Sequence, residues 1–180
     1  MNILAFDSHT TWQQVFSDWR AREVAWGWED VWQPRGFASW DEWRRTYTEP
    51  LGFESRSWQI FRVDDPVAVV PDMWAVAYSG WKRYYPPGAS RARLQDIAAH
   101  PDLPQNEKII GLQNFFPNPT TLIAIRSGDD FALFEGMHRA STIALVAREG
   151  RRVAGELFVT LTTFGPDEKM LFEKAITQKE

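Results

Sequence analysis

The sequence has no cysteine and only three histidines among its 180 residues. Without cysteine the chain has no disulfide bond, no thiolate nucleophile and no zinc site built on sulfur. Long apolar runs are missing as well. None approaches the roughly 18 residues that a membrane-spanning helix needs, and the first residues lack the basic and then apolar pattern of a secretory signal. We therefore expect a cytoplasmic protein that does not span a membrane.

An excess of basic charge is also lacking. The chain carries 20 Lys and Arg against 24 Asp and Glu, a net charge of -4 with His neutral. Nothing in this balance favours a nucleic-acid binder, although a local basic patch stays open. With 44% hydrophobic and 24% charged residues the chain can bury a core of ordinary size. Its length suits one domain, or one domain with a subdomain.

Tryptophan, by contrast, is abundant and unevenly placed. None lies after Trp81, where the chain is rich in aliphatic residues. This asymmetry divides the chain into a Trp-rich helical N-terminal extension, residues 1–57, and an α+β domain, residues 58–180. At helical spacing the tryptophans are either core residues or a stacking platform for bases, sugars or a partner. The ten are Trp12, Trp19, Trp26, Trp28, Trp32, Trp40, Trp43, Trp58, Trp74 and Trp81.

Apolar spacing and turn residues predict the elements of the first two thirds of the chain. Strands are expected over 58–63 and 66–70. Three helices are expected to follow a capping residue: one over about 9–25 after Ser8 or Thr10, one over 40–47 after Ser39, and one around Leu94 to Ala98 after Ser90. Two further helices are expected, from Pro71 through Trp81 and over 106–112.

The C-terminal part has the clearest pattern. Residues 121–126 and 131–135 read as two strands joined by a hairpin turn, and Gly136 leads directly into a helix over 137–149 that Gly150 ends. A strand over 156–163 and a helix over 167–177 follow. The expected fold is therefore α+β, a small mixed sheet with packed helices.

The turn between the hairpin and the next helix is the best candidate site. The free amides of the first helical turn, together with the helix dipole, favour an anion. Gly136 lets a ligand approach the backbone closely, the amide of Met137 opens the helix, and His138, Arg139 and Ser141 add donors suited to phosphate oxygens. A phosphorylated small molecule is the expected ligand.

A purely structural interpretation of the same residues stays open. A glycine between a strand and a helix is common. Arg139 would then pair with Glu135 or Glu107, and His138 would be a surface residue.

The stretch from Leu122 to Leu145 resembles the core of the ParB/sulfiredoxin superfamily. That family presents a hairpin, a Gly-x-x-Arg or Gly-x-His-Arg turn and a helix, and it binds nucleotide phosphates at the turn. Here Gly136, His138 and Arg139 match the motif, and residues 129–131 match the turn and the strand start. The resemblance implies a ParB/sulfiredoxin-like fold with a nucleotide, ATP or CTP, at Gly136 to Ser141.

Departures from the family narrow the expected function. Sulfiredoxins place a reactive cysteine between the Gly and the His, where this chain has Met137, so sulfinic-acid repair is excluded. Partition proteins of the ParB type carry a helix-turn-helix domain and a dimerisation segment after this core, which we do not find in these 180 residues, so we do not expect a role in chromosome partition. Members with an Asp-Gly-x-His-Arg-like turn remain, among them nucleotide-dependent kinases of small molecules and domains proposed to be nucleases.

Glu135 occupies the place of that Asp. It could hold Mg²⁺ or accept a proton from an attacking hydroxyl, with His138 as the second candidate catalytic residue. The alternative is that Glu135 is an ordinary partner of Arg139 or Arg126. A phosphotransferase or nucleotide hydrolase is the most concrete activity that follows.

Two other functions stay open. One is a non-catalytic binding module whose Trp-rich part docks a protein or nucleic acid, and the other is a ParB-like nuclease, which the net charge disfavours. The basic, aromatic stretch Lys82 to Tyr85 is either a further phosphate contact or a solvated surface. His9 and His100 are too isolated in sequence to predict a metal site.

Overall fold

The computed structural model describes residues 4–28 and 31–177. The chain forms two compact units, one of residues 9–58 and the other of residues 59–180 together with the segment before residue 9. The C-terminal boundary of the smaller unit lies next to the expected one at residue 57. The segment that precedes His9 belongs with the larger unit, not with the Trp-rich part.

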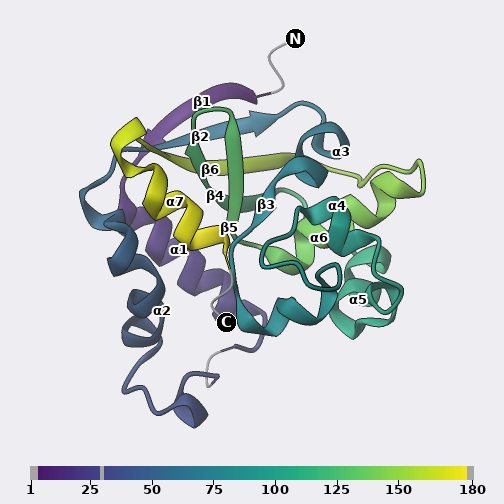
Figure 1. The fold of residues 1–180 in the computed structure, drawn as a ribbon, viewed down its shortest axis with the longest axis horizontal. Helices are drawn as coiled ribbons and strands as arrows, with labels where there is room; N and C mark the ends of the chain where they lie inside the picture. Colours follow the sequence, from purple (N-terminus) through teal and green to yellow (C-terminus); the bar gives the residue numbers. More distant parts are fainter. Residues whose placement is uncertain (1–3, 29–30, 178–180) are drawn as a thin grey trace. The chain divides into compact units, whose positions relative to one another are not determined.

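One six-stranded mixed sheet organises the larger unit (Figure 1). Its strands are β1 (Leu4–Thr10), β2 (Trp58–Val63), β3 (Trp74–Ala75), β4 (Thr120–Ser127), β5 (Asp130–Glu135) and β6 (Leu157–Phe164). Their order in the sheet is β1-β2-β6-β4-β5-β3. β4 is antiparallel to β5 and parallel to β6, β6 is antiparallel to β2, and β3 is parallel to β5.

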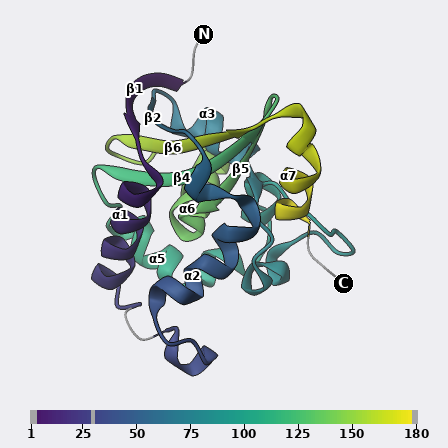
Figure 2. The same cartoon turned by 90° about the vertical axis from the view of Figure 1, so that its left-hand side faces the viewer.

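α6 (Met137–Arg148) is the central helix of this unit and connects β5 to β6. Its side chains from Met137 to Val146 are nearly all buried, because it packs against α4 (Leu94–Ala98) and α5 (Glu107–Asn114) as well as β5. Figure 2 shows α5 beside α6. The remaining helices of the unit are α3 (Pro66–Val69) and α7 (Lys169–Ile176). The expected α+β class is confirmed.

The hairpin and the helix that follows it are confirmed closely. Gly128 adopts a positive φ in the two-residue turn between β4 and β5, and Gly150, with φ +69°, follows the end of α6. The strand at Trp58–Val63 is also confirmed, and the helix expected over 106–112 is α5, with Asn106 as its N-terminal cap.

Other predicted elements are wrong. Residues Pro66–Val69 form the short helix α3 in place of a strand. No helix runs from Pro71 to Trp81; the chain makes a 3₁₀ turn, the short strand β3 and a 3₁₀ helix over Ser79–Tyr84. Met73 and Val76 are buried around an extended segment that pairs with β5 on one side, and its apolar spacing imitates that of a helix.

Two helix starts also differ from expectation. α1 (Trp12–Ala25) begins after β1, with Thr11 as its cap, because the residues assigned to its first turn belong to a strand that the sequence did not reveal. α4 is capped at Arg93, whose backbone N–H donates to Asp96 Oδ2 at 2.9 Å, and not at Ser90.

Tryptophans form the core of the smaller unit, which contains α1 and α2 (Trp40–Thr48). The interpretation as core residues is confirmed for five of them, each exposed by 6% or less, whereas Trp26 is 44% exposed. Their rings contact one another or the neighbouring phenylalanines, as when Trp12 stacks on Trp58 with centroids 5.2 Å apart. The buried members are Trp12, Trp19, Trp40, Trp43 and Trp58.

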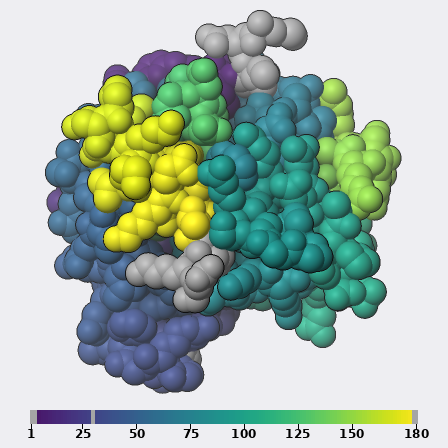
Figure 3. Space-filling model, viewed as in Figure 1, coloured from purple at the N-terminus to yellow at the C-terminus, as the bar shows by residue number. Residues whose placement is uncertain are grey.

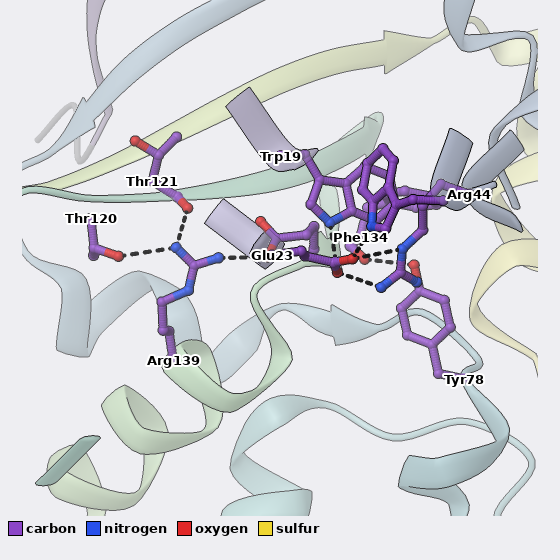
Figure 4. Close-up of polar contacts among 10 residues, drawn as sticks. Trp19, Glu23, Arg44, Tyr78, Thr120, Thr121, Phe134 and Arg139 are labelled. Carbon is purple, nitrogen blue, oxygen red and sulfur yellow. Dashed lines mark hydrogen bonds and ion pairs between the residues drawn. The ribbon is translucent and has the colours of Figure 1, made fainter. Parts of the chain in front are cut away.

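A buried ion pair lies within this aromatic core. The carboxylate of Glu23 accepts hydrogen bonds from the indole N–H groups of Trp19 at 2.9 Å and Trp40 at 2.6 Å. It also pairs with the guanidinium of Arg44, which lies 3.6 Å from the ring centroid of Trp43. Figure 4 draws Trp19, Glu23 and Arg44 together. Both oxygens of this carboxylate therefore accept hydrogen bonds, which offset the cost of burying its charge.

Candidate functional site

The turn before α6 is closed around a glycine. Gly136 has φ +99°, a left-handed conformation, and a Cβ atom there would lie 2.4 Å from Leu122 Cδ2 and 3.1 Å from Arg139 Nη2. Only glycine satisfies both constraints. The end of β5, two residues before the glycine, is held too, because the Tyr78 hydroxyl donates to the Phe134 carbonyl at 2.8 Å (Figure 4). The chain thus leaves β5 sharply and presents the first amides of α6.

Arg139 anchors the turn to the neighbouring strand. The residue is 7% exposed, and its guanidinium donates to Glu135 Oε1 at 2.6 Å, to the Thr121 carbonyl at 2.8 Å and to Thr120 Oγ1 at 3.2 Å (Figure 4). The structure therefore shows the pairing with Glu135 and gives Arg139 a positioning role. That Arg139 also contacts a phosphate stays a prediction.

Glu135 is the acidic partner of Arg139 in this ion pair. Its side chain is mostly buried, and Arg139 neutralises its charge. A role of Glu135 as metal ligand or proton acceptor stays a prediction. Among residues 4–28 and 31–177, no group of three His, Cys, Asp or Glu side chains is placed to hold a metal ion.

His138 lies in the first turn of α6, with its ring edge-on to Trp81 at a centroid distance of 4.9 Å. Burial lowers the pKa of His138 to about 4, and the positive charges of Lys108, Arg139 and Arg83 add to this effect. The imidazole is therefore neutral at pH 7, so one ring nitrogen donates a hydrogen bond and the other accepts one.

Met137 and Ser141 turn inward. The Met137 side chain joins the hydrophobic core, so that its contribution to a ligand would come from its backbone amide. Ser141 is fully buried, and its hydroxyl has no hydrogen-bond partner among the described residues. Their contact with a phosphate stays a prediction.

The structure adds cations that sequence reasoning did not connect to the turn. Arg83 comes from the 3₁₀ helix Ser79–Tyr84 and Lys108 from the first turn of α5; both are exposed, and both act electrostatically on His138. The segments between residues 79 and 110, teal in Figure 3, form a continuous area of surface on the face in view. The sequence shows Lys82 to Tyr85 as a basic, aromatic stretch, but no spacing rule relates this stretch to a turn more than fifty residues later.

No family model, curated protein or solved structure matches the chain. Within the described part of the chain, no helix has the length and apolar character to cross a membrane.

Proposed function

We propose that this protein binds a phosphorylated small molecule at the start of α6, with a nucleotide, ATP or CTP, as the expected ligand and the cytoplasm as its compartment. The single observation that carries the proposal is the concentration of positive charge around His138. Arg83, Lys108 and Arg139 all act on this one imidazole, at the positive end of a twelve-residue helix.

The charge pattern selects for an anion. Desolvation and three cations disfavour a further positive charge on His138. Arg139 is already paired with Glu135, so Arg83 and Lys108 are the cations that favour a negatively charged ligand beside the imidazole. The neutral imidazole then serves as a hydrogen-bond donor without adding repulsion among the cations. The resemblance of residues 122–145 to the ParB/sulfiredoxin superfamily supports a phosphate as the anionic group.

Binding is the part of the function that this geometry supports best. The candidate catalytic carboxylate, Glu135, is held by Arg139, so phosphotransfer or nucleotide hydrolysis with Mg²⁺ would require that pair to open. We therefore treat catalysis as an extension of the binding proposal, with its own readout.

Calorimetry with ATP and CTP, each with and without Mg²⁺, tests the proposal on the full chain. We expect at least one nucleotide to bind, and Lys108→Ala to weaken its affinity roughly fivefold or more, because a charge-assisted contact is lost. Lys169→Ala is the matched control, since Lys169 is an exposed lysine on α7 of the same unit. It should bind as the wild type does.

Absence of binding by the wild type to both nucleotides would refute the proposal, as would equal losses in Lys108→Ala and Lys169→Ala. Phosphate release from the same Mg²⁺-containing samples reports catalysis separately. Release that stops in Glu135→Gln would assign the protein as an enzyme.

A further inference from the structure

The hydroxyl of Tyr84 is surrounded by hydrogen-bond donors. Arg83 Nη2 lies 2.7 Å from Tyr84 Oη, and Asn106 Nδ2 lies 3.1 Å from it. A guanidinium carries no acceptor, so Arg83 can only donate to the phenol oxygen.

The orientation of the Asn106 amide is fixed by α5. Asn106 Oδ1 accepts hydrogen bonds from the backbone N–H groups of Lys108 at 3.0 Å and Ile109 at 3.3 Å, which caps the helix. The amino group of Asn106 must therefore face Tyr84. Both neighbours of the phenol oxygen are donors, and that oxygen accepts two hydrogen bonds.

The proton of the Tyr84 hydroxyl is consequently left to be donated. No side chain or carbonyl of the described residues accepts it, since the only hydrogen bonds of Tyr84 there are the two that it receives. The residue is 4% exposed. A buried donor without an acceptor is destabilising, so this proton calls for an acceptor from outside the chain.

The surroundings of Tyr84 favour an anionic acceptor. Arg83 donates a hydrogen bond to the phenol oxygen, and Lys108 follows Asn106 by two residues in the chain. Trp81 packs between Tyr84, at 5.5 Å, and His138, at 4.9 Å, which joins this group to the start of α6. Cations together with an O–H donor that has no acceptor in the chain suit the oxygens of a phosphate.

We propose that Tyr84 donates its hydroxyl proton in a hydrogen bond to the anionic group of the ligand, with Arg83 and Lys108 supplying the countercharge. This inference rests on the proposed function and adds to it a specific donor outside the Gly136 to Ser141 turn. It also assigns the stretch around Arg83 to binding and not to a merely solvated surface.

Calorimetry on the full chain with ATP, CTP and inorganic pyrophosphate tests this inference. Tyr84→Phe retains the ring and removes only the hydroxyl, and we expect its dissociation constants to rise roughly tenfold or more, since the lost bond is to a charged acceptor. Tyr47→Phe, at an exposed tyrosine of the smaller unit, is the control and should leave them unchanged. Thermal unfolding verifies that both variants fold.

The outcomes separate the two proposals. Wild-type binding with equal affinity in Tyr84→Phe overturns the inference and leaves the proposed function standing, because the hydroxyl then donates to water. No binding of any of the three probes by the wild type overturns both.

A second measurement covers the case in which Tyr84→Phe does not fold. The chain has four tyrosines, so 3-fluorotyrosine labelling of the wild type gives four ¹⁹F resonances. These are assigned by the phenylalanine variants of the other three. The Tyr84 resonance must shift when the tightest probe is added, and a resonance that does not move overturns the inference.

Discussion

Gly136 and Arg139 together fix where α6 begins. The glycine allows the backbone to turn at φ +99°, and the arginine closes over it to reach Glu135 and the first residues of β4. The sequence predicted the turn, because a glycine between a strand and a helix is a local signal. It left the partner of Arg139 open, because side-chain pairing depends on the neighbouring strand, which the local pattern does not position.

Gly136→Ala tests this account at the scale of one residue. The new methyl group would lie 2.4 Å from Leu122 and would impose a strained φ, so we expect a loss of roughly 2–4 kcal/mol in the free energy of unfolding. Urea denaturation measures it.

Gly111→Ala is the matched control for that variant. Gly111 lies inside α5, and a Cβ atom there would meet nothing within 4 Å. We expect this change to stabilise the chain by about 0.5–1 kcal/mol, because alanine is the better helix former. Equal effects of the two substitutions would mean that the turn is not constrained as described.

At the scale of elements, the strongest local signals were predicted best. The β4–β5 hairpin and α6 combine turn residues, alternation and a C-terminal glycine, and all of these agree with the structure. The prediction of a helix from Pro71 to Trp81 was wrong, because the buried residues around a two-residue strand have the same apolar spacing as a helix. β1 was missed because it is a sheet-edge strand of mixed polarity, with two of its residues, Phe6 and Asp7, exposed next to each other.

Packing between α1 and α2 leads to a prediction at this scale. Glu23 on α1 accepts from Trp19 and Trp40 and pairs with Arg44 on α2. Glu23→Ala leaves the Arg44 guanidinium and two indole N–H groups without their acceptor in a buried site. We expect it to cost roughly 3–5 kcal/mol in unfolding monitored by tryptophan fluorescence.

The exposed pair between the same two helices is the comparison. Arg20 and Asp41 are 3.2 Å apart and well exposed, so Arg20→Ala should cost less than about 1 kcal/mol. A cost of Glu23→Ala as small as that of Arg20→Ala would show that the buried pair does not stabilise this core.

At the scale of the whole molecule, the candidate site depends on topology. Arg83, Lys108 and His138 come from three separate segments, and only the folded order of the larger unit brings their charges together. The sequence indicated the first turn of α6 and, separately, a basic stretch. It could not indicate that both belong to one region, since no spacing rule relates residues so far apart. The same limit applies to Tyr84, which the sequence indicated only as part of that basic stretch, because its proposed role follows from the two donors that the fold brings to its hydroxyl.

The charge of His138 reports this convergence directly, and its titration tests the central claim. Burial and three cations hold the pKa of His138 at about 4 in the free protein, and a bound anion must raise it by stabilising the imidazolium. Because the pKa is then higher in the complex than in the free chain, affinity for the anion must increase as the pH falls toward the pKa of the complex.

The decisive measurement is therefore an NMR titration of the His138 ring, with and without a saturating concentration of the nucleotide that binds most tightly. The account predicts a pKa of about 4 without ligand and a clearly higher value with it. A free-protein pKa near the ordinary 6.5, or a value that the nucleotide leaves unchanged, would contradict the claim that an anionic ligand binds beside this residue.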